Sequence, residues 1–207
     1  MSTLYVIATP IGNLEDITFR ALRILSKVDV IVAEDTRVTS KLLRKYEIKS
    51  VIESYSNKDI KYKTAKFLGY LENHDLALVT DAGTPAISDP GKDLVDQAIT
   101  HGFKVVSVPG PSSLTASASI SGLELSNFLY LGFLPNKSVA RRKALLAVAN
   151  LNYPLIIFES PHRLGNCLED MKKVLGDRLV VICRELTKLH EEIFRGDITQ
   201  AQQYFAN

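Results

Sequence analysis

The chain has 207 residues, of which 46% are hydrophobic and 23% charged, and its formal net charge at pH 7 is +2. This composition is typical of a soluble globular protein, and the length suffices for one large domain or two small ones. The near-neutral charge argues against a strongly basic nucleic-acid-binding domain, so any contact with RNA must come from local clusters of basic residues.

Signals for membranes, export and metals are weak throughout the sequence. No run approaches the roughly 18 apolar residues of a membrane span, and the amino terminus lacks the basic and apolar regions of a signal peptide. We therefore expect a cytoplasmic protein that does not contact membranes. Cys167 and Cys183 are not spaced as a disulfide framework or as metal ligands, so we expect reduced thiols and no metal site.

Apolar runs alternate with helical periodicity along the first half of the chain, which predicts repeated strand–helix units. Strands are expected at residues 4–8, 30–33, 50–54, 76–80 and 104–108, and helices at 18–28, 36–46, 61–72, 93–101 and 112–121. Apolar strands joined by helices indicate a mainly parallel sheet with helices on both faces.

The pattern changes near residues 122–128 and the alternation then resumes. Strands are expected at 128–133, 155–158, 179–183 and 192–195, and helices at 139–150, at 162–175 and after Gly196. We predict an α/β protein of two domains, residues 1–122 and residues 123–207. Because the second domain has few strands, we expect it to be either small or incomplete.

The loop from Asp81 to Gly91 carries the strongest functional signal. It follows an apolar strand, precedes a helix and contains Pro85 and Pro90, and it is longer than the usual βα connection of about 2–6 residues. Ligands of open α/β sheets bind outside the carboxyl ends of strands, so we predict a binding loop. Asp81 is placed to accept hydrogen bonds from ribose hydroxyls or an amine, or alternatively to cap the loop.

Three further strand-end loops, residues 9–13, 109–113 and 159–163, are also rich in Gly, Pro, Ser and Thr. None of the loops contains a phosphate-binding fingerprint. Together they predict a walled crevice for a ligand without phosphates.

Several ionisable residues lie beside these loops, each with two interpretations. Glu34 and Asp35 could serve as acid or base, or as a helix cap and salt-bridge partner. His162 could be a base near neutral pH or a surface histidine. The run Arg141-Arg142-Lys143 could bind RNA phosphates or be a solvated basic turn.

Seven segments resemble, in the same order, the signature segments of the ribosomal RNA small subunit methyltransferase I group, within the tetrapyrrole methylase superfamily. They are ATPIGNL (8–14), AEDTR (33–37), TDAGTP with ISDPG (80–91), VPGPS (108–112), GFLP (132–135), ESPHR (159–163) and RELTK (184–188). The resemblance spans nearly the whole chain.

This resemblance implies two α/β domains with S-adenosylmethionine in the cleft between them, commonly in a homodimer. Members of the group transfer a methyl group to the ribose 2′-oxygen of a cytidine in the decoding region of 16S rRNA. The implied partner is therefore 16S rRNA, within the 30S subunit. S-adenosylmethionine has no phosphate, which agrees with the crevice predicted from the loops.

The resemblance also implies roles for individual residues. The expected cofactor contacts are Pro10, Ile11, Asp81, Ala82, Gly83, Thr84, Ser112, Ser113 and, in the second domain, Phe133. The candidates for a base or for a group that orients the ribose hydroxyl are Glu34, Asp35, His162 and Glu185. The expected partners of RNA phosphates are Arg37, Arg163, Arg184 and Lys188.

Two features depart from the group. After Tyr55 the relatives often have a histidine-containing polar stretch, whereas this chain has Ser56-Asn57-Lys58-Asp59. The relatives also extend beyond the equivalent of Asn207, so second-domain strands or RNA contacts are expected to be missing. Two alternatives stay open: a methyltransferase acting on a tetrapyrrole precursor, and a protein that binds S-adenosylmethionine or RNA without turnover.

Overall fold

The computed structural model describes residues 2–55 and 59–206. Residues 56–58, where the chain departs from the expected histidine-containing stretch, lie outside the described residues. The chain divides into two compact units, Met1–Ser113 and Leu114–Asn207, so this division falls nine residues before the boundary predicted after residue 122.

The first unit is built on a five-stranded sheet in the order β3-β2-β4-β1-β5, in which every recorded pairing is parallel. Its strands are β1 (Thr3–Ile7), β2 (Val30–Ala33), β3 (Val51–Ser54), β4 (Leu76–Val79) and β5 (Lys104–Val108). The predicted parallel α/β architecture is thus confirmed. The inner strands β2 and β4 are buried along their whole length, because helices cover both faces of the sheet.

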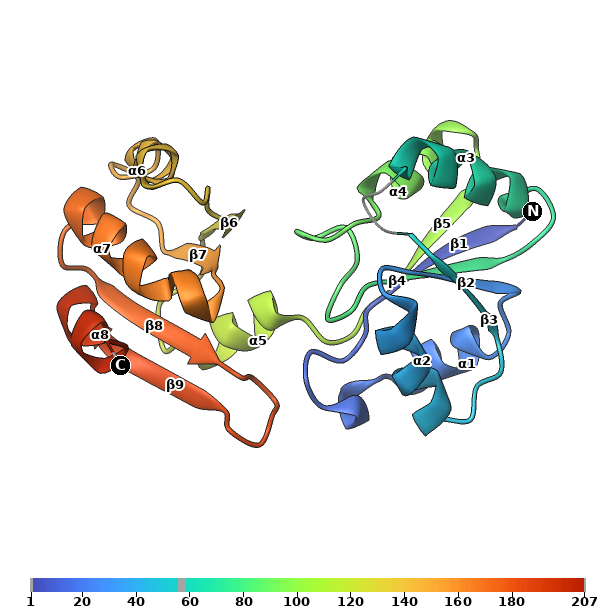
Figure 1. The fold of residues 1–207 in the computed structure, drawn as a ribbon, viewed down its shortest axis with the longest axis horizontal. Helices are drawn as coiled ribbons and strands as arrows, with labels where there is room; N and C mark the ends of the chain where they lie inside the picture. Colours follow the sequence, from blue (N-terminus) through green and yellow to red (C-terminus); the bar gives the residue numbers. More distant parts are fainter. Residues whose placement is uncertain (1, 56–58, 207) are drawn as a thin grey trace. The chain divides into compact units, whose positions relative to one another are not determined.

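Two pairs of helices form these two layers (Figure 1). Helices α1 (Phe19–Leu25) and α2 (Thr36–Lys45) pack on one face in a core that includes Leu25, Leu42 and Ile31. Helices α3 (Ile60–Leu71) and α4 (Lys92–Thr100) pack on the other face, around Phe67 and Leu94. A short 3-10 helix, η1 (Leu14–Asp16), precedes α1.

The second unit contains two small sheets. Strands β6 (Leu129–Phe133) and β7 (Leu155–Phe158) pair in parallel, and β8 (Leu179–Arg184) and β9 (Glu192–Asp197) pair antiparallel. The helical elements are α5 (Ser113–Ile120), which begins at the last residue of the first unit, and α6 (Ser138–Leu146), η2 (Pro161–Arg163), α7 (Leu164–Leu175) and α8 (Ile198–Tyr204). Apolar contacts centred on Leu145 and Leu168 join the helices to these strands.

Element ends differ from the predictions by a few residues, for local reasons. Helix α1 starts after Thr18, whose hydroxyl accepts a hydrogen bond from the backbone N–H of Ala21. Helix α2 starts at Thr36, after the N-cap residue Asp35, whose side chain accepts a hydrogen bond from the backbone N–H of Arg37. Helix α6 ends at Leu146, and the chain then continues in turns held by i→i+3 bonds such as that from the N–H of Val148 to the carbonyl of Leu145.

Candidate functional site

Loops from three strands of the first sheet converge at Gly83. A Cβ atom on Gly83 would lie 3.5 Å from Cγ2 of Ile11 and 3.9 Å from the carbonyl oxygen of Pro111. These residues follow β4, β1 and β5, so the carboxyl ends of neighbouring parallel strands bring them to one edge. Gly83 has φ of +86°, which glycine adopts without the steric cost that other residues incur.

The loop after β4 is fastened to the loop after β1 by backbone hydrogen bonds. The N–H of Thr9 donates to the carbonyl of Gly83 (2.8 Å), and the N–H of Gly83 donates to the carbonyl of Thr9 (3.0 Å). The buried Thr9 hydroxyl also donates to the carbonyl of Thr80 (3.0 Å). The two loops therefore form one continuous hydrogen-bonded surface.

Glu34 follows β2 and is held at the same edge by groups that follow β4. Its Oε2 accepts from the Thr80 hydroxyl (2.7 Å) and from the backbone N–H of Asp81 (3.4 Å). The carboxylate of Asp81 in turn accepts from the N–H of Asp35 (3.0 Å). Reciprocal bonds thus fix two carboxylates, both half-buried, between adjacent strands.

Asp89 adds a third acidic group to this edge. Burial, together with the negative charges of Glu34 and Asp81, raises the pKa of Asp89 to about 6. Burial and the nearby charges of Glu34 and Asp35 also raise the pKa of Asp81, although the N–H of Asp35 favours its ionised form. The carboxyl groups of Glu34, Asp81 and Asp89 thus lie together at the carboxyl end of the sheet, here called the acidic edge. This arrangement suits cationic groups or hydroxyl donors.

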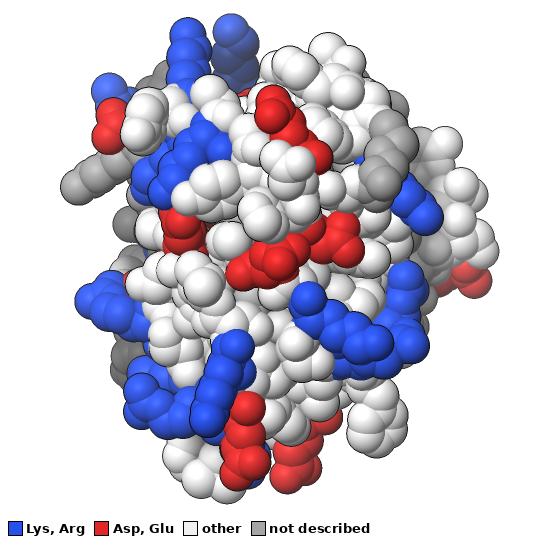
Figure 2. All heavy atoms as spheres, turned by 90° about the vertical axis from the view of Figure 1, so that its right-hand side faces the viewer, with Lys and Arg blue, Asp and Glu red and all other residues white. Residues whose placement is uncertain are grey.

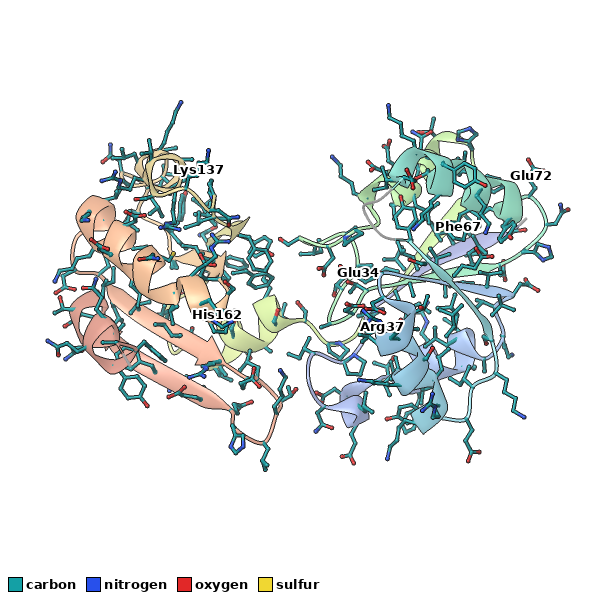
Figure 3. All side chains as sticks on the ribbon, viewed as in Figure 1. Glu34, Arg37, Phe67, Glu72, Lys137 and His162 are labelled. Carbon is teal, nitrogen blue, oxygen red and sulfur yellow. The ribbon has the colours of Figure 1, made fainter. Side chains whose placement is uncertain are left out.

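Asp35 has the cap and salt-bridge role that the sequence left as one of its two interpretations. Its Oδ1 accepts from the backbone N–H of Arg37 (2.8 Å) and from the Arg37 Nε (3.0 Å). These bonds, with the charge of Arg37, lower the pKa of Asp35 to about 2. Figure 3 shows Glu34 and Arg37 close together at the start of α2. A carboxylate of such low pKa is a weak proton acceptor near neutral pH.

Phe133 ends β6 in the second unit and is 55% exposed. Its ring packs edge-on against Phe158 at 5.6 Å between centroids, and Phe158 also contacts Tyr130. Two strands therefore present an aromatic surface that could stack on a flat ligand.

The segment after Phe133 is held by an ion pair that the sequence did not predict. Nη2 of Arg163 donates to the carbonyl of Leu134 (2.7 Å) and lies 3.1 Å from Oε2 of Glu159, whose side chain is only 7% exposed. Glu159 also accepts from the N–H of Ser160 (2.7 Å). Arg163 therefore has a structural role within the second unit.

The other predicted candidates of the second unit lie on its surface. His162 is exposed in η2, at the start of α7 (Figure 3). Glu185 has φ of +53° and pairs with Lys188 at 3.1 Å, whereas Arg184 pairs with Glu192 at 3.3 Å. All four cations expected to contact RNA, Arg37 and Arg163 included, thus pair with a carboxylate of their own unit.

Two site residues and one structural residue were missed by the sequence analysis. Thr80 and Asp89 belong to the acidic edge, and the only available signal was that both lie in or beside the predicted binding loop. Arg141 was assigned either to RNA or to solvent, but it is buried and paired with Asp170 at 2.7 Å. Burial of this guanidinium excludes both interpretations for Arg141.

Neither a metal centre nor a membrane helix is found within residues 2–55 and 59–206. No three His, Cys, Asp or Glu side chains in these ranges are arranged to hold a metal ion. None of the helices there has the length and apolar character needed to cross a membrane.

Comparison with known proteins identifies the family of this chain. Residues 3–202 match the family model described as Tetrapyrrole (Corrin/Porphyrin) Methylases. A protein named ribosomal RNA small subunit methyltransferase I from Thermotoga maritima is 46% identical, over 99% of this chain and 92% of the relative. Proteins of the same name from Halalkalibacterium halodurans and Neisseria meningitidis serogroup B are 47% and 44% identical, over 96% and 97% of this chain and 69% of each relative.

Solved structures agree at the level of fold. A diphthine synthase crystal structure has a TM-score of 0.76 at 14% identity, covering 98% of this chain and 84% of that chain. The methyltransferase CobJ has a TM-score of 0.73 at 17% identity, covering 99% and 90%. Because the loops of the acidic edge lie within the matched residues, and because several relatives exceed 40% identity over nearly the whole chain, the chain belongs to the tetrapyrrole methylase family and, within it, to the ribosomal RNA small subunit methyltransferase I group.

Proposed function

We propose that this protein transfers a methyl group from S-adenosylmethionine to the ribose 2′-oxygen of a cytidine in the decoding region of 16S rRNA. The proposed substrate is the 30S subunit, and the proposed working form is a cytoplasmic homodimer. The observation that carries the proposal is the convergence of three loops at Gly83 beside an acidic edge, in a chain of this methyltransferase group.

The residues at the edge fit the proposed cofactor. S-adenosylmethionine supplies, when bound, a methyl group on a positively charged sulfur. Its sulfonium and amino groups are cationic and its ribose hydroxyls are donors, so the carboxylate of Asp81 is a suitable partner. We assign the remaining first-unit contacts to Pro10, Ile11, Ala82, Gly83, Thr84, Ser112 and Ser113. Phe133 is assigned to the adenine ring.

Within the first unit, we assign Glu34 to the 2′-hydroxyl of the substrate cytidine. Oε2 is held by Thr80 and Asp81. A carboxylate fixed at one oxygen can orient a hydroxyl, or accept its proton, at the other. Most of the acceleration is expected from alignment of the reactants, for which effective molarities of ~10⁵ M or more are possible. His162 and Glu185 remain predicted candidates of the second unit.

Cofactor binding is tested first, by isothermal titration of the chain with S-adenosylmethionine. Asp81→Ala should weaken binding, while the matched control Asp96→Ala, exposed on α4, should leave it unchanged. Equal affinities of the parent and Asp81→Ala would remove Asp81 from the cofactor site. No binding by the parent would contradict the cofactor assignment.

Methyl transfer is tested next, with unmethylated 30S subunits and with naked 16S rRNA. A 2′-O-methyl group blocks alkaline cleavage at the modified nucleotide, so hydrolysis ladders identify both the atom and the position. Glu34→Gln should lower kcat by about 10²–10⁴-fold, while the exposed control Glu72→Gln should be unaffected. A methyl group on a base, or on a tetrapyrrole precursor instead of RNA, would overturn the proposal. Binding without turnover would favour the non-catalytic alternative. Sedimentation of the active protein tests the homodimer.

A further inference from the structure

We propose that α2 carries a binding surface for the phosphate backbone of the substrate RNA, formed by Arg37, Lys41, Arg44 and Lys45, here called the α2 stripe. The proposal rests on the proposed function, because it takes rRNA as the substrate. Lys41, Arg44 and Lys45 were not among the residues that the sequence suggested for RNA contact.

The four cations lie on one side of the helix. Lys41, Arg44 and Lys45 follow Arg37 by four, seven and eight residues, which places all four on a common face. The opposite face, with Thr39, Leu42 and Leu43, is buried against the sheet. At about 1.5 Å of rise per residue the stripe extends roughly 12 Å along the helix, and all four side chains belong to exposed residues.

Ordinary helix stabilisation explains only part of this pattern. Arg44 and Lys45 lie in the last turn, where cations interact favourably with the helix dipole. Arg37, in the first turn, pairs with the N-cap residue Asp35. Lys41 lies mid-helix, where neither the helix dipole nor an ion pair recorded among the described residues accounts for it. Solvated helix faces commonly alternate signs in i,i+4 pairs, yet the sequence of α2, TRVTSKLLRK, contains no acidic residue.

The position of the stripe supplies the link to the substrate. The N-terminus of α2 is fixed at the acidic edge by Asp35, whose backbone N–H donates to Asp81. The carboxylates of that edge repel phosphates, so an RNA strand that reaches Glu34 needs cations beside it. The α2 stripe begins there and leads away from it. No ion pair is recorded for Lys41, Arg44 or Lys45 within the described part of the chain.

On the face of the molecule that Figure 2 shows, the basic side chains do not form one continuous area. Figure 2 shows lysines and arginines in separate groups with acidic groups between them. Local sets of cations are therefore the means by which a chain of net charge +2 can hold a polyanion.

The test is the salt dependence of binding to naked 16S rRNA and to 30S subunits, between about 50 and 200 mM salt. The variant Lys41→Gln/Arg44→Gln/Lys45→Gln should give a log K against log[salt] slope shallower by about 2–3, and Lys41→Gln alone by about 0.7–0.9. The matched control is Lys61→Gln/Lys92→Gln/Lys104→Gln, which removes the same charge from exposed positions on α3, α4 and β5. It should keep the parental slope. Unchanged affinity for S-adenosylmethionine verifies that the variants fold.

Each other result overturns the proposal in a distinguishable way. An equal decrease in both triple variants would mean that net charge alone acts, and parental slopes in the stripe variants would remove α2 from the interface. An effect on 30S subunits but not on naked rRNA would assign the stripe to a ribosomal protein. If the parent chain binds neither RNA form, the proposed function itself fails, and the α2 stripe fails with it.

Discussion

Asp170→Asn should destabilise the second unit by about 3 kcal/mol. The side chains of Asp170 and Arg141 are each 4% exposed, and Asp170 accepts from Nε of Arg141 and from the Ser138 hydroxyl, both at 2.8 Å. Removal of one partner from a buried ion pair costs about 3–5 kcal/mol, because the other charge stays buried. Arg141 retains longer bonds to the carbonyls of Asn136 (3.4 Å) and Asn166 (3.3 Å), so we take the lower end of this range.

Calorimetric thermal unfolding is the appropriate assay, because it can resolve separate transitions of the two units. For a domain of 60–100 residues, about 3 kcal/mol corresponds to a Tm lower by about 12–24 °C. The control is the neighbouring Glu169→Gln, which breaks an exposed pair with Lys173 and should cost less than about 0.5 kcal/mol. The double variant Arg141→Met/Asp170→Leu should recover much of the loss, since apolar replacement of a buried pair is often neutral. If Asp170→Asn and Glu169→Gln cost the same, the reasoning is refuted.

Three further outcomes are expected. Because the folded-state pKa of Asp89 is raised to about 6, its protonation contributes stability that is complete below about pH 4 and lost as pH rises through about 6. Asp89→Asn should therefore flatten the plot of Tm against pH over this range. An unchanged plot would contradict the assignment. Glu159→Gln and Arg163→Gln should show a coupling energy of about 1 kcal/mol or more in a double-mutant cycle followed by urea unfolding, whereas additive effects would mean that the pair is not formed. Gly91→Ala should lower the free energy of unfolding by about 1–3 kcal/mol, because φ at this position is +129° and the new Cβ would lie 2.8 Å from Cδ2 of Leu78. An unshifted urea midpoint would argue against this backbone conformation.

The secondary structure of the first unit could be predicted because its inner strands are apolar at every position. Runs such as Val30–Ala33 and Leu76–Val79 are buried on both faces. In a chain where such runs alternate with helices, a parallel sheet between two helix layers provides that environment. The strand order could not be predicted. Complete burial indicates that a strand has neighbours on both sides but carries no information about which strands they are.

The candidate site was predictable in its location and less so in its contacts. Parallel strands share a carboxyl edge, so loops singled out for their composition had to lie close to one another. Ion pairing depends instead on distant partners. Arg184 lies opposite Glu192 in the β8–β9 register, and the partner of Arg141 is 29 residues away. A cation in a sequence therefore does not reveal whether its charge is available to RNA.

The paired backbone bonds between Thr9 and Gly83 have a consequence for the thermodynamics of ligand capture. Segments 74 residues apart are held together at Thr9 and Gly83, so this part of the two loops is already fixed when a ligand arrives. Binding to such a preorganised edge avoids a large part of the conformational entropy cost that mobile loops impose. A substitution that weakens these two hydrogen bonds would lower the affinity for the ligand even if the altered side chain does not touch the ligand.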